Sequence, residues 1–541
     1  MRWISLGASL ALLLASFALR QLNAPAWART AFYLAPALCA ACWGWKRRAS
    51  VKRALPFTAL TIVCALPALL TGTAAEAAAR IAIATAMSLF ALCGLGGALQ
   101  KLTDAPALTK ASGGQIWLLL MLMTTLACCL SWSFHYPVGL TYDLQNQLDQ
   151  MQGLIDYANI HSIGHTLFLK LGLETFGSLA AVVLMQILLV SAVCAAFGLR
   201  LWHDGCSWEP LLLCLSGVLL CSPVMEWMGF LYKDVPYSAC VLLVTLGLVE
   251  TTDDRPVKPL HAAIFGGALA WTALLRLNGL AIVLPCAVIF GVRLRRQWKA
   301  LLCLLLSAAL CLGGVAAVSR LVLHPREQKN GFAVAVFASG IAAVVTEEGA
   351  IAPAQQEQLD EIFGDELLDW MRTHYHARDK SWMFWEREYE LDPVPEPMQD
   401  PNLHVFNNRF VLRLGERQAD VIRLYFQLLP HNLGLMLGDV LWNTTTIWSI
   451  GADNFPYENM ALLLTLLFAL SLLWRRETWR RRWPVLAPIV FNALSIAVSA
   501  ATNEPRYLLS TVLAFPLLLG LAVADGRKTG QSDLQTPVNP V

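Results

Sequence analysis

The sequence predicts an all-α polytopic membrane protein with about 14 transmembrane helices and a mainly helical region outside the membrane. Of the 541 residues, 57% are hydrophobic and only 14% are charged, and the mean hydropathy is +0.54, a balance typical of helices dissolved in lipid. Apolar stretches of roughly 20 residues, the length that crosses about 30 Å of hydrocarbon, recur along the chain. A net charge of +2 argues against a nucleic-acid partner.

The predicted spans follow the apolar pattern and cover residues 4–20, 30–45, 54–72, 78–98, 115–134, 177–199, 207–222, 235–250, 260–275, 280–292, 300–319, 457–474, 484–501 and 507–524. The first span follows Arg2 and resembles a signal peptide. It has no convincing cleavage site, so we interpret it as a helix that stays in the membrane. The 14 cysteines lie in or beside apolar segments, so we expect them to pack between helices without disulfides.

Blocks of Lys and Arg predict the orientation, because cytoplasmic loops are enriched in these residues. With Arg2 inside, the blocks at 46–53, 293–299 and 475–482 all fall on the cytoplasmic side, together with both chain ends. The outer face then holds the polar segments 135–162, 223–234, 276–279, 321–456 and 502–506. The predicted organisation is a transmembrane core at 1–320 with its first outer loop at 135–162, an extracytoplasmic subdomain at 321–456, C-terminal transmembrane helices at 457–525 and a cytoplasmic tail at 526–541.

The segment 321–456 is too long for a simple connection, so we expect a partly folded outer subdomain. Its stretch 345–400 is acidic, with 15 Asp and Glu against 4 Lys and Arg. The run from Gln355 to Arg372 has the apolar periodicity of a helix, whereas the Pro- and Asp-rich 391–402 predicts irregular structure. Residues 420–450 are apolar but interrupted by Pro, and predict helices lying at or dipping into the membrane interface.

The first outer loop carries the main candidate for chemistry, Asp143. A carboxylate at a membrane boundary costs desolvation free energy unless a function uses it. The alternative is that Asp143 caps a short interfacial helix. His161 and His165 follow with i, i+4 spacing, which places two imidazoles on one helix face, suited either to a divalent metal or, as we favour for two histidines alone, to hydrogen bonding. His161 is the better candidate because it lies nearer the loop.

Three further outer loops each present one cation beside a helix end, an arrangement that suits an anionic lipid headgroup. Lys233 precedes a span, Arg276 lies in a tight turn, and Arg506 opens the last span. The alternatives are snorkelling to the interface, a local pair between Lys233 and Asp234, and a local pair between Arg506 and Glu504. The neighbours that would support such a site are Asn278, Glu504 and Tyr507.

Tyr142-Asp143 in the first outer loop, the Lys233-Asp234 string, the Arg276 turn with Asn278 and Gly279, and the string from Glu504 to Tyr507 together resemble the GT-C superfamily of membrane glycosyltransferases. The similarity is closest to bacterial branches of the protein-mannosyltransferase and lipid-A aminoarabinose-transferase kind, and the topology match covers most of the chain. The second acid of many members is absent, because Leu144 and Gln145 follow Asp143. This departure argues against tight metal binding at Asp143.

The resemblance implies an inverting transferase of the bacterial cytoplasmic (inner) membrane, with its active site on the extracytoplasmic face. Its donor would be a polyprenyl-phosphate-linked sugar, its acceptor a glycan, lipid or protein of the cell envelope, and its only cofactor a divalent cation, Mg or Mn, if any. Asp143 would be the general base, and a lone carboxylate in a partly desolvated pocket should be a stronger base than one in water. The donor phosphate would bind Lys233, Arg276 and Arg506, with support from Tyr142, Gln147, His161, His165, Asn278, Glu504 and Tyr507.

Two other functional classes remain open from the sequence. About 14 helices is also a common layout for a lipid-linked glycan flippase or another transporter, although a transporter would place charges midway through its helices and often shows repeated halves. A glycan polymerase or ligase also takes lipid-linked donors, but such enzymes concentrate Arg and His in their large outer loop. No nucleotide-binding glycine loop is present, which favours a lipid-linked donor over a sugar nucleotide.

Overall fold

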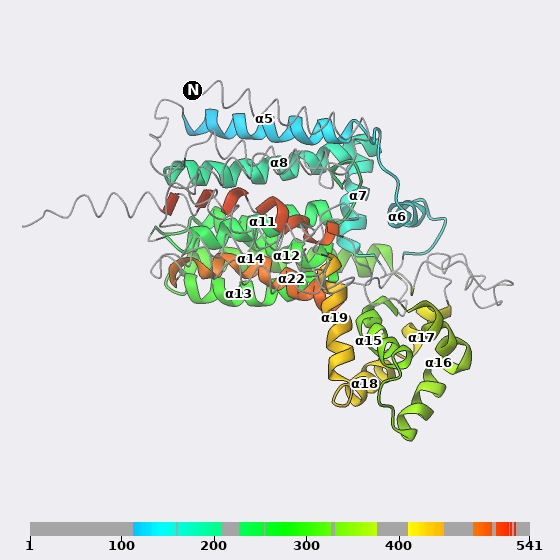
Figure 1. The fold of residues 1–541 in the computed structure, drawn as a ribbon. Coiled ribbons are helices and arrows are strands. Elements are labelled where there is room, and N and C mark those ends of the chain that lie inside the picture. The colour runs from blue at the N-terminus through cyan, green and yellow to red at the C-terminus, as the bar shows by residue number, and fades with distance from the viewer. Residues whose placement is uncertain are drawn as a thin grey trace, which may run out of the picture.

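The computed structural model describes residues 112–157, 161–206, 227–253, 255–325, 331–375, 383, 409–447, 480–499, 505–514, 516–518, 520–521 and 524–525. These residues are helical apart from turns, loops and one isolated bridge between Gly139 and Phe230. They form a bundle of roughly parallel helices with a smaller helical unit at one end (Figure 1). The predicted all-α class is confirmed for this part of the chain. The predicted spans at 4–20, 30–45, 54–72, 78–98, 207–222 and 457–474 lie outside it.

Five segments of the bundle are long and apolar enough to cross a bilayer. They are α5 (Gly113–Trp132), α8 (Leu179–His203), α11 (Asp234–Thr251), the 3-10 turn η1 with α13 (Leu277–Gly279 and Leu280–Leu294), and α14 with the π-helical turn η2 (Trp298–Val318 and Ser319–Leu323). The chain is therefore a membrane protein, and five of the predicted spans coincide with helices. The total of about 14 spans stays a prediction.

Three further segments complete the described bundle. The 17-residue α12 (Pro259–Leu275) occupies the predicted span 260–275, and Pro stands at its first position, where a missing N–H costs nothing. The 3-10 turn η8 (Trp483–Leu486) and α22 (Ala487–Ser499) occupy all but the last two residues of the predicted span 484–501. The turn η9 (Pro505–Leu508) begins the last apolar helix, Arg506–Leu518.

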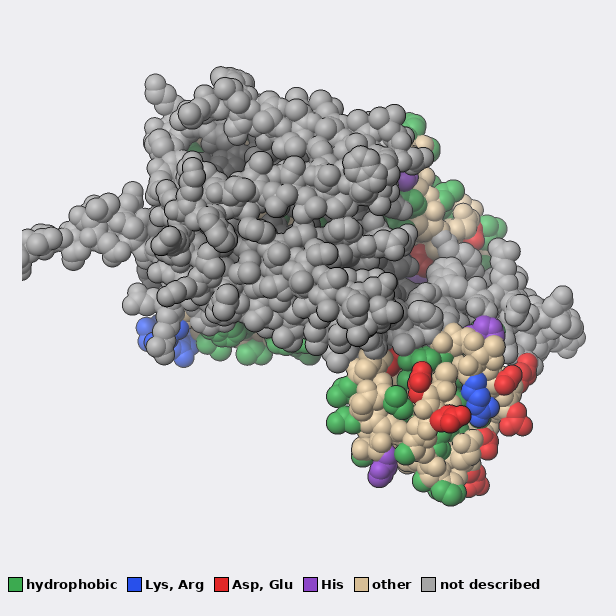
Figure 2. Space-filling view, viewed as in Figure 1, with side chains coloured by type: hydrophobic (Ala, Val, Ile, Leu, Met, Phe, Trp, Pro, Cys, Tyr) green, Lys and Arg blue, Asp and Glu red, His purple; other side chains and the backbone are tan. Residues whose placement is uncertain are grey.

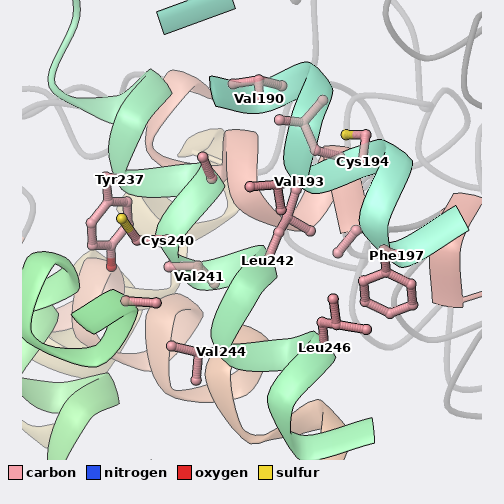
Figure 3. Packing of buried hydrophobic residues seen from close by; sticks show 14 of the residues in the cluster. Val190, Val193, Cys194, Phe197, Tyr237, Cys240, Val241, Leu242, Val244 and Leu246 are labelled. Carbon is pink, nitrogen blue, oxygen red and sulfur yellow. The ribbon is translucent and has the colours of Figure 1, made fainter. Parts of the chain in front are cut away.

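Helix α11 is the centre of the bundle core, with almost every residue buried. Its Leu242 and Leu246 lie beside Val193 and Phe197 of α8 (Figure 3). The outer faces of α5, α13 and α14 instead expose large apolar side chains, including Leu126, Leu284 and Leu310. Burying such side chains in lipid is favourable, because the hydrocarbon is as apolar as they are.

Two shorter helices lie beyond the end of the bundle: α6 (Tyr142–Gln152) and α7 (Ile163–Phe176), which runs across the bundle direction (Figure 1). The start of α7 is held against the end of α12, because Ser162 Oγ donates a hydrogen bond to the Leu275 carbonyl. Gly164 allows this close crossing, since a Cβ there would collide with the carbonyl of Leu274. Gly177, with φ of +68°, ends α7 and separates it from α8.

The smaller unit is formed by residues of the segment 321–456, for which the sequence predicts an outer subdomain. It consists of η3 (Gly331–Val334), α15 (Ala335–Thr346), α16 (Pro353–His374), α17 (Arg409–Glu416), α18 (Gln418–Leu428) and α19 (Leu433–Ile447), and it has its own apolar core. The helix predicted from Gln355 to Arg372 is present within α16, but Gly364, with φ of +70° and ψ of 167°, breaks α16 into two helices, which the periodicity did not predict. The apolar face of α16 is buried as its periodicity predicts, at Leu359, Ile362, Phe363, Leu367 and Trp370. The predicted irregular segment 391–402 lies outside the described residues.

The surface of this unit carries acidic side chains, and the basic side chains visible in the same view lie mainly at the far end of the bundle (Figure 2). The unit is joined to the bundle through α19, which contacts α22 and η9. Within the predicted interfacial stretch 420–450, α18 buries Val421, Leu424 and Leu428 in the core of the unit.

Candidate functional site at one end of the bundle

Five charged side chains from four distant segments meet at the end of the bundle that carries α6 and α7. Lys233 Nζ lies 3.5 Å from Asp143 Oδ2. Arg276 Nη1 contacts Asp234 Oδ1, and Arg506 Nε lies 3.9 Å from the other oxygen of the same carboxylate. The sequence predicts Asp143, Lys233, Arg276 and Arg506 as site residues from separate outer loops, and the structure brings all four together. It adds Asp234, which the sequence suggested only as a local partner of Lys233.

Asp143 is held in the first turn of α6, where a negative charge is favoured by the helix dipole. The cap of this helix is Thr141, whose Oγ1 accepts a hydrogen bond from Leu144 N at 3.1 Å. The alternative interpretation, in which Asp143 itself is the cap, is therefore wrong. Asp143 faces Lys233 instead.

The electrostatics of Asp143 differ from the sequence-based expectation of a lone, strongly basic carboxylate. Burial acts to raise its pKa, but the attraction of Lys233, with that of His161 and Arg506, outweighs burial and holds the pKa of Asp143 well below its ordinary range. While the pair with Lys233 persists, Asp143 is thus a weaker base than a carboxylate in water. The expectation failed because it considered only the desolvation of Asp143 and not the effect of the predicted cations on its basicity.

The two arginines are fixed in place by aromatic rings and an amide. The guanidinium carbon of Arg506 lies 4.1 Å from the centre of the Tyr232 ring, and that of Arg276 lies 4.4 Å from the centre of the Tyr507 ring. Arg276 Nε also donates to Asn278 Oδ1 at 3.0 Å. These contacts orient both planar groups before any ligand binds, which lowers the entropic cost of binding an anion.

The supporting amide of Asn278 links this cluster to α22. Its Nδ2 donates to Ser495 Oγ at 3.1 Å, and the nearby Asn492 accepts from the Tyr237 hydroxyl at 2.8 Å. Asn278 and Tyr507 thus both contact Arg276, one of the predicted site residues. Of the other predicted neighbours, Glu504 and the side chain of Tyr142 lie outside the described part of the chain.

Exposure divides the cluster into a buried and an accessible half. The side chain of Asp234 is 3% exposed, and those of Arg276 and Arg506 are 11% and 13% exposed. The side chains of Lys233 and Asp143 are 26% and 35% exposed. Within the described ranges this cluster contains three cations against two carboxylates, an excess of positive charge that favours an anionic ligand.

Two buried histidines, His161 and His165, lie beside this cluster, and a hydrogen-bonded chain holds His165. Gln147 Nε2 donates to Thr166 Oγ1 at 2.9 Å, so the Oε1 of Gln147 faces His165 Nδ1, also at 2.9 Å. This orientation requires the proton of His165 on Nδ1. Burial lowers the pKa of His165 to about 3 and that of His161 to about 4, so both imidazoles are neutral at pH 7.

The i, i+4 argument for the histidine pair is wrong, because only His165 is in a helix. The cap of α7 is Ser162, so His161 precedes the helix and the shared-face geometry does not apply. No group of three His, Cys, Asp or Glu side chains suited to hold a metal forms among the residues that the structure describes. The part of the chain that the structure describes thus assigns no ligands to the expected divalent cation, and we assign no step to one.

Protein-family models, curated proteins and solved structures all give no match to the chain. The resemblance to the GT-C superfamily therefore remains an expectation based on short motifs and topology.

Sequence reasoning missed several residues that complete the site, above all Asp234, Tyr232 and Asn492. One signal was present for Asp234: a carboxylate that opens an apolar helix needs a partner. Tyr232 precedes Lys233 in the sequence, but its ring lies under Arg506, from a distant segment. Tyr507 follows Arg506, but its ring lies closer to Arg276 than to Arg506.

Proposed function

We propose that the chain is an inverting glycosyltransferase that moves a sugar from a polyprenyl-phosphate donor to an acceptor on the extracytoplasmic face of a bacterial cytoplasmic membrane. The observation that carries the proposal is the meeting of one accessible carboxylate, Asp143, with three cations at one end of a bundle of membrane-spanning helices. A glycosyl transfer from a lipid phosphate needs a base for the acceptor and cations for the leaving group. The acceptor class is a glycan, lipid or protein of the cell envelope.

Each side chain has a separate task in the proposed reaction. Arg276, Arg506 and Lys233 bind the phosphate oxygens of the donor through charge-assisted hydrogen bonds. The acceptor hydroxyl attacks the anomeric carbon from the face opposite the phosphate and forms the new C–O bond, while the old bond breaks and its electron pair leaves on the phosphate oxygen. The hydroxyl proton passes to Asp143. One displacement inverts the configuration, and no covalent sugar–protein intermediate is required.

The position of the cluster supports a lipid-linked substrate. Its residues lie at the ends of α11, α12 and the last apolar helix, next to helices that expose apolar side chains. A polyprenyl tail is soluble in the bilayer beside such helices, and its phosphate then lies at the level of their polar ends. The smaller helical unit lies at the same end of the bundle (Figure 1). In the proposal, the acceptor approaches the cluster from this end, outside the bundle.

The test is sugar transfer by the purified protein in detergent, with a radiolabelled polyprenyl-phosphate monosaccharide and a membrane-extract acceptor. Wild-type protein should transfer the label, and Asp143→Asn should lose about 10²- to 10⁴-fold in kcat. Asp149→Asn is the matched control, because Asp149 lies on the same helix and contacts Gln145 rather than the cations. Unchanged turnover in Asp143→Asn would remove Asp143 from the mechanism. Movement of labelled donor across proteoliposomes without any transfer would replace the transferase with a flippase.

A further inference from the structure

The two carboxylates of the cluster are held in unequal ways. Asp234 is buried and shared by Arg276 and Arg506, whose planes are stacked on tyrosine rings. Asp143 is about a third exposed, and its ion pair with Lys233 has an N–O distance of 3.5 Å. The arginines are thus anchored by both a carboxylate and a ring. Lys233 is tied to a single accessible partner.

Lys233 is also the cation best able to change partners. Its side chain has four rotatable carbons and three donors on a compact charge, whereas a guanidinium locked on a ring has one productive orientation. Asp143, Arg276 and Arg506 act on Lys233 electrostatically, and the neutral imidazoles of His161 and His165 also lie within reach of its charge. A phosphate drawn to the two arginines would therefore arrive next to Lys233.

We propose that Asp143 and the donor phosphate compete for Lys233, so that binding of the donor releases Asp143 to act as the base. The inference deepens the proposed function and rests on it. In the ligand-free protein Lys233 keeps Asp143 weakly basic, so Asp143 stays deprotonated until the donor binds. When the phosphate takes the lysine, Asp143 loses a neighbouring cation and gains a neighbouring anion. Both changes increase its affinity for a proton.

The coupling must be reciprocal, because two ligands that compete for one group weaken each other equally. Asp143 therefore reduces the affinity of the site for phosphate, and its removal should tighten binding while abolishing transfer. This outcome separates the proposal from a purely structural role for the ion pair. A structural pair would lose affinity when either partner is removed.

The experiment measures binding of polyprenyl monophosphate to purified protein in detergent for wild type, Asp143→Asn, Lys233→Met and the double variant. Asp143→Asn should bind the lipid about 5- to 150-fold more tightly than wild type, the usual range for coupled sites. Lys233→Met should bind it more weakly. In the Lys233→Met background, Asp143→Asn should then leave the affinity nearly unchanged. Asp149→Asn should match wild type, and an unshifted unfolding temperature verifies each fold.

Several results would overturn the proposal. If Asp143→Asn raised the affinity for the lipid phosphate equally in the wild-type and Lys233→Met backgrounds, Asp143 would act by direct repulsion of the phosphate and not through Lys233. If the affinity did not rise at all, Asp143 and the phosphate would not compete. Either result leaves the transferase proposal standing. Failure of every form, wild type included, to bind the lipid phosphate would instead remove the proposed function itself.

A second measurement tests the same inference without a variant. The acid limb of the kcat/KM profile reports the base in the free enzyme, and that of kcat reports the base in the donor complex. Because donor binding releases Asp143, the limb of kcat should lie at the higher pH. If the acid limbs of kcat/KM and kcat fell at the same pH, Lys233 would not move from Asp143 to the donor phosphate.

Discussion

The two ends of the bundle use buried charge in different ways. At the site end, the described cluster has three cations against two carboxylates, and its Lys233 side is open. At the other end, an ion-pair network joins three arginines to three aspartates: Arg200, Arg481 and Arg482 with Asp204, Asp253 and Asp525. The first arrangement has one positive charge that its own carboxylates do not balance, as the proposed anionic donor requires. In the second, the carboxylates already balance the arginines.

The balanced network joins helices rather than binding a ligand. Arg482, just before η8, is fully buried. Its Nη2 lies 2.9 Å from Oδ1 of Asp525, and its Nη1 lies 3.3 Å from Oδ1 of Asp253, beyond the end of α11. Asp253 also contacts Arg200 of α8. The comparison therefore predicts that changes at this end act on stability, whereas changes at the site end act on transfer.

The largest expected effect is on stability, from Arg482→Met. This change leaves Asp525 and Asp253 without a buried cation, and breaking a buried pair in this way costs about 3–5 kcal/mol. Thermal unfolding of the detergent-solubilised protein measures the loss. Arg481→Met is the matched control: Arg481 also contacts Asp525, but it is 41% exposed, so its removal should cost less than about 1 kcal/mol. Equal unfolding temperatures for the two variants would refute the structural role of the network.

The next effect is on transfer, from Arg276→Gln. Removing one preorganised cation from the leaving phosphate should lower kcat by about 10²- to 10³-fold. The unfolding temperature should fall less than in Arg482→Met, because Asp234 keeps Arg506 as a partner. Arg293→Gln, near the opposite end of α13, is the control and should transfer at the wild-type rate. A wild-type kcat in Arg276→Gln would show that the two ends do not differ as proposed.

The sequence predicts features that depend on neighbouring residues better than contacts between residues far apart in the chain. Apolar length and helical periodicity are local, so the spans around α8 and α11 and the helical character of Gln355 to Arg372 could be predicted, but the break at Gly364 within that run could not. The loop cations were also predictable, since each stands beside a helix end. Their pairing was not, because it depends on tertiary packing: Arg276 contacts Asp234, a residue 42 positions away in the chain.

Two local rules also failed, for identifiable physical reasons. Lys233 and Asp234 are adjacent, which suggested a pair, but neighbouring residues at a helix start point in different directions. The rule that i and i+4 share a face holds only when both residues are helical, and the Ser162 cap leaves His161 outside α7. Caps and turns therefore decided what spacing alone did not.

The stability of the protein should fall at acid pH because of the site end, where the described residues include two buried, neutral histidines. Burial lowers the pKa of His161 from 6.5 to about 4 and that of His165 from 6.5 to about 3. The unfolded chain then binds more protons than the folded one below pH 6.5, so stability is lost as the pH falls from 6.5 towards 4, by about 1.4 kcal/mol per pH unit for each histidine.

The measurement is the unfolding temperature between pH 7 and pH 5 for wild type and His165→Gln. The substitution removes one of the two proton-binding groups, so the variant should lose stability about half as steeply. Asp143 does not contribute in this window, because its lowered pKa costs stability only below about pH 4. Identical slopes in both proteins would mean that His165 is not buried in its neutral form.

The smallest expected effect tests whether the site end depends on the close crossing of α7 over α12. Gly164→Ala places a Cβ against the carbonyl of Leu274, which cannot rotate away as a side chain can, so α7 must shift. Overpacking of this kind costs about 1–3 kcal/mol. Gly314→Ala, on α14, is the matched control, because a Cβ there meets no described atom within 4 Å and Ala favours the helix. Since α7 carries His165 and Thr166 beside Gln147 of α6, Gly164→Ala should also lower transfer, whereas Arg481→Met should not. Loss of stability with transfer unchanged would show that the position of α7 does not govern the chemistry.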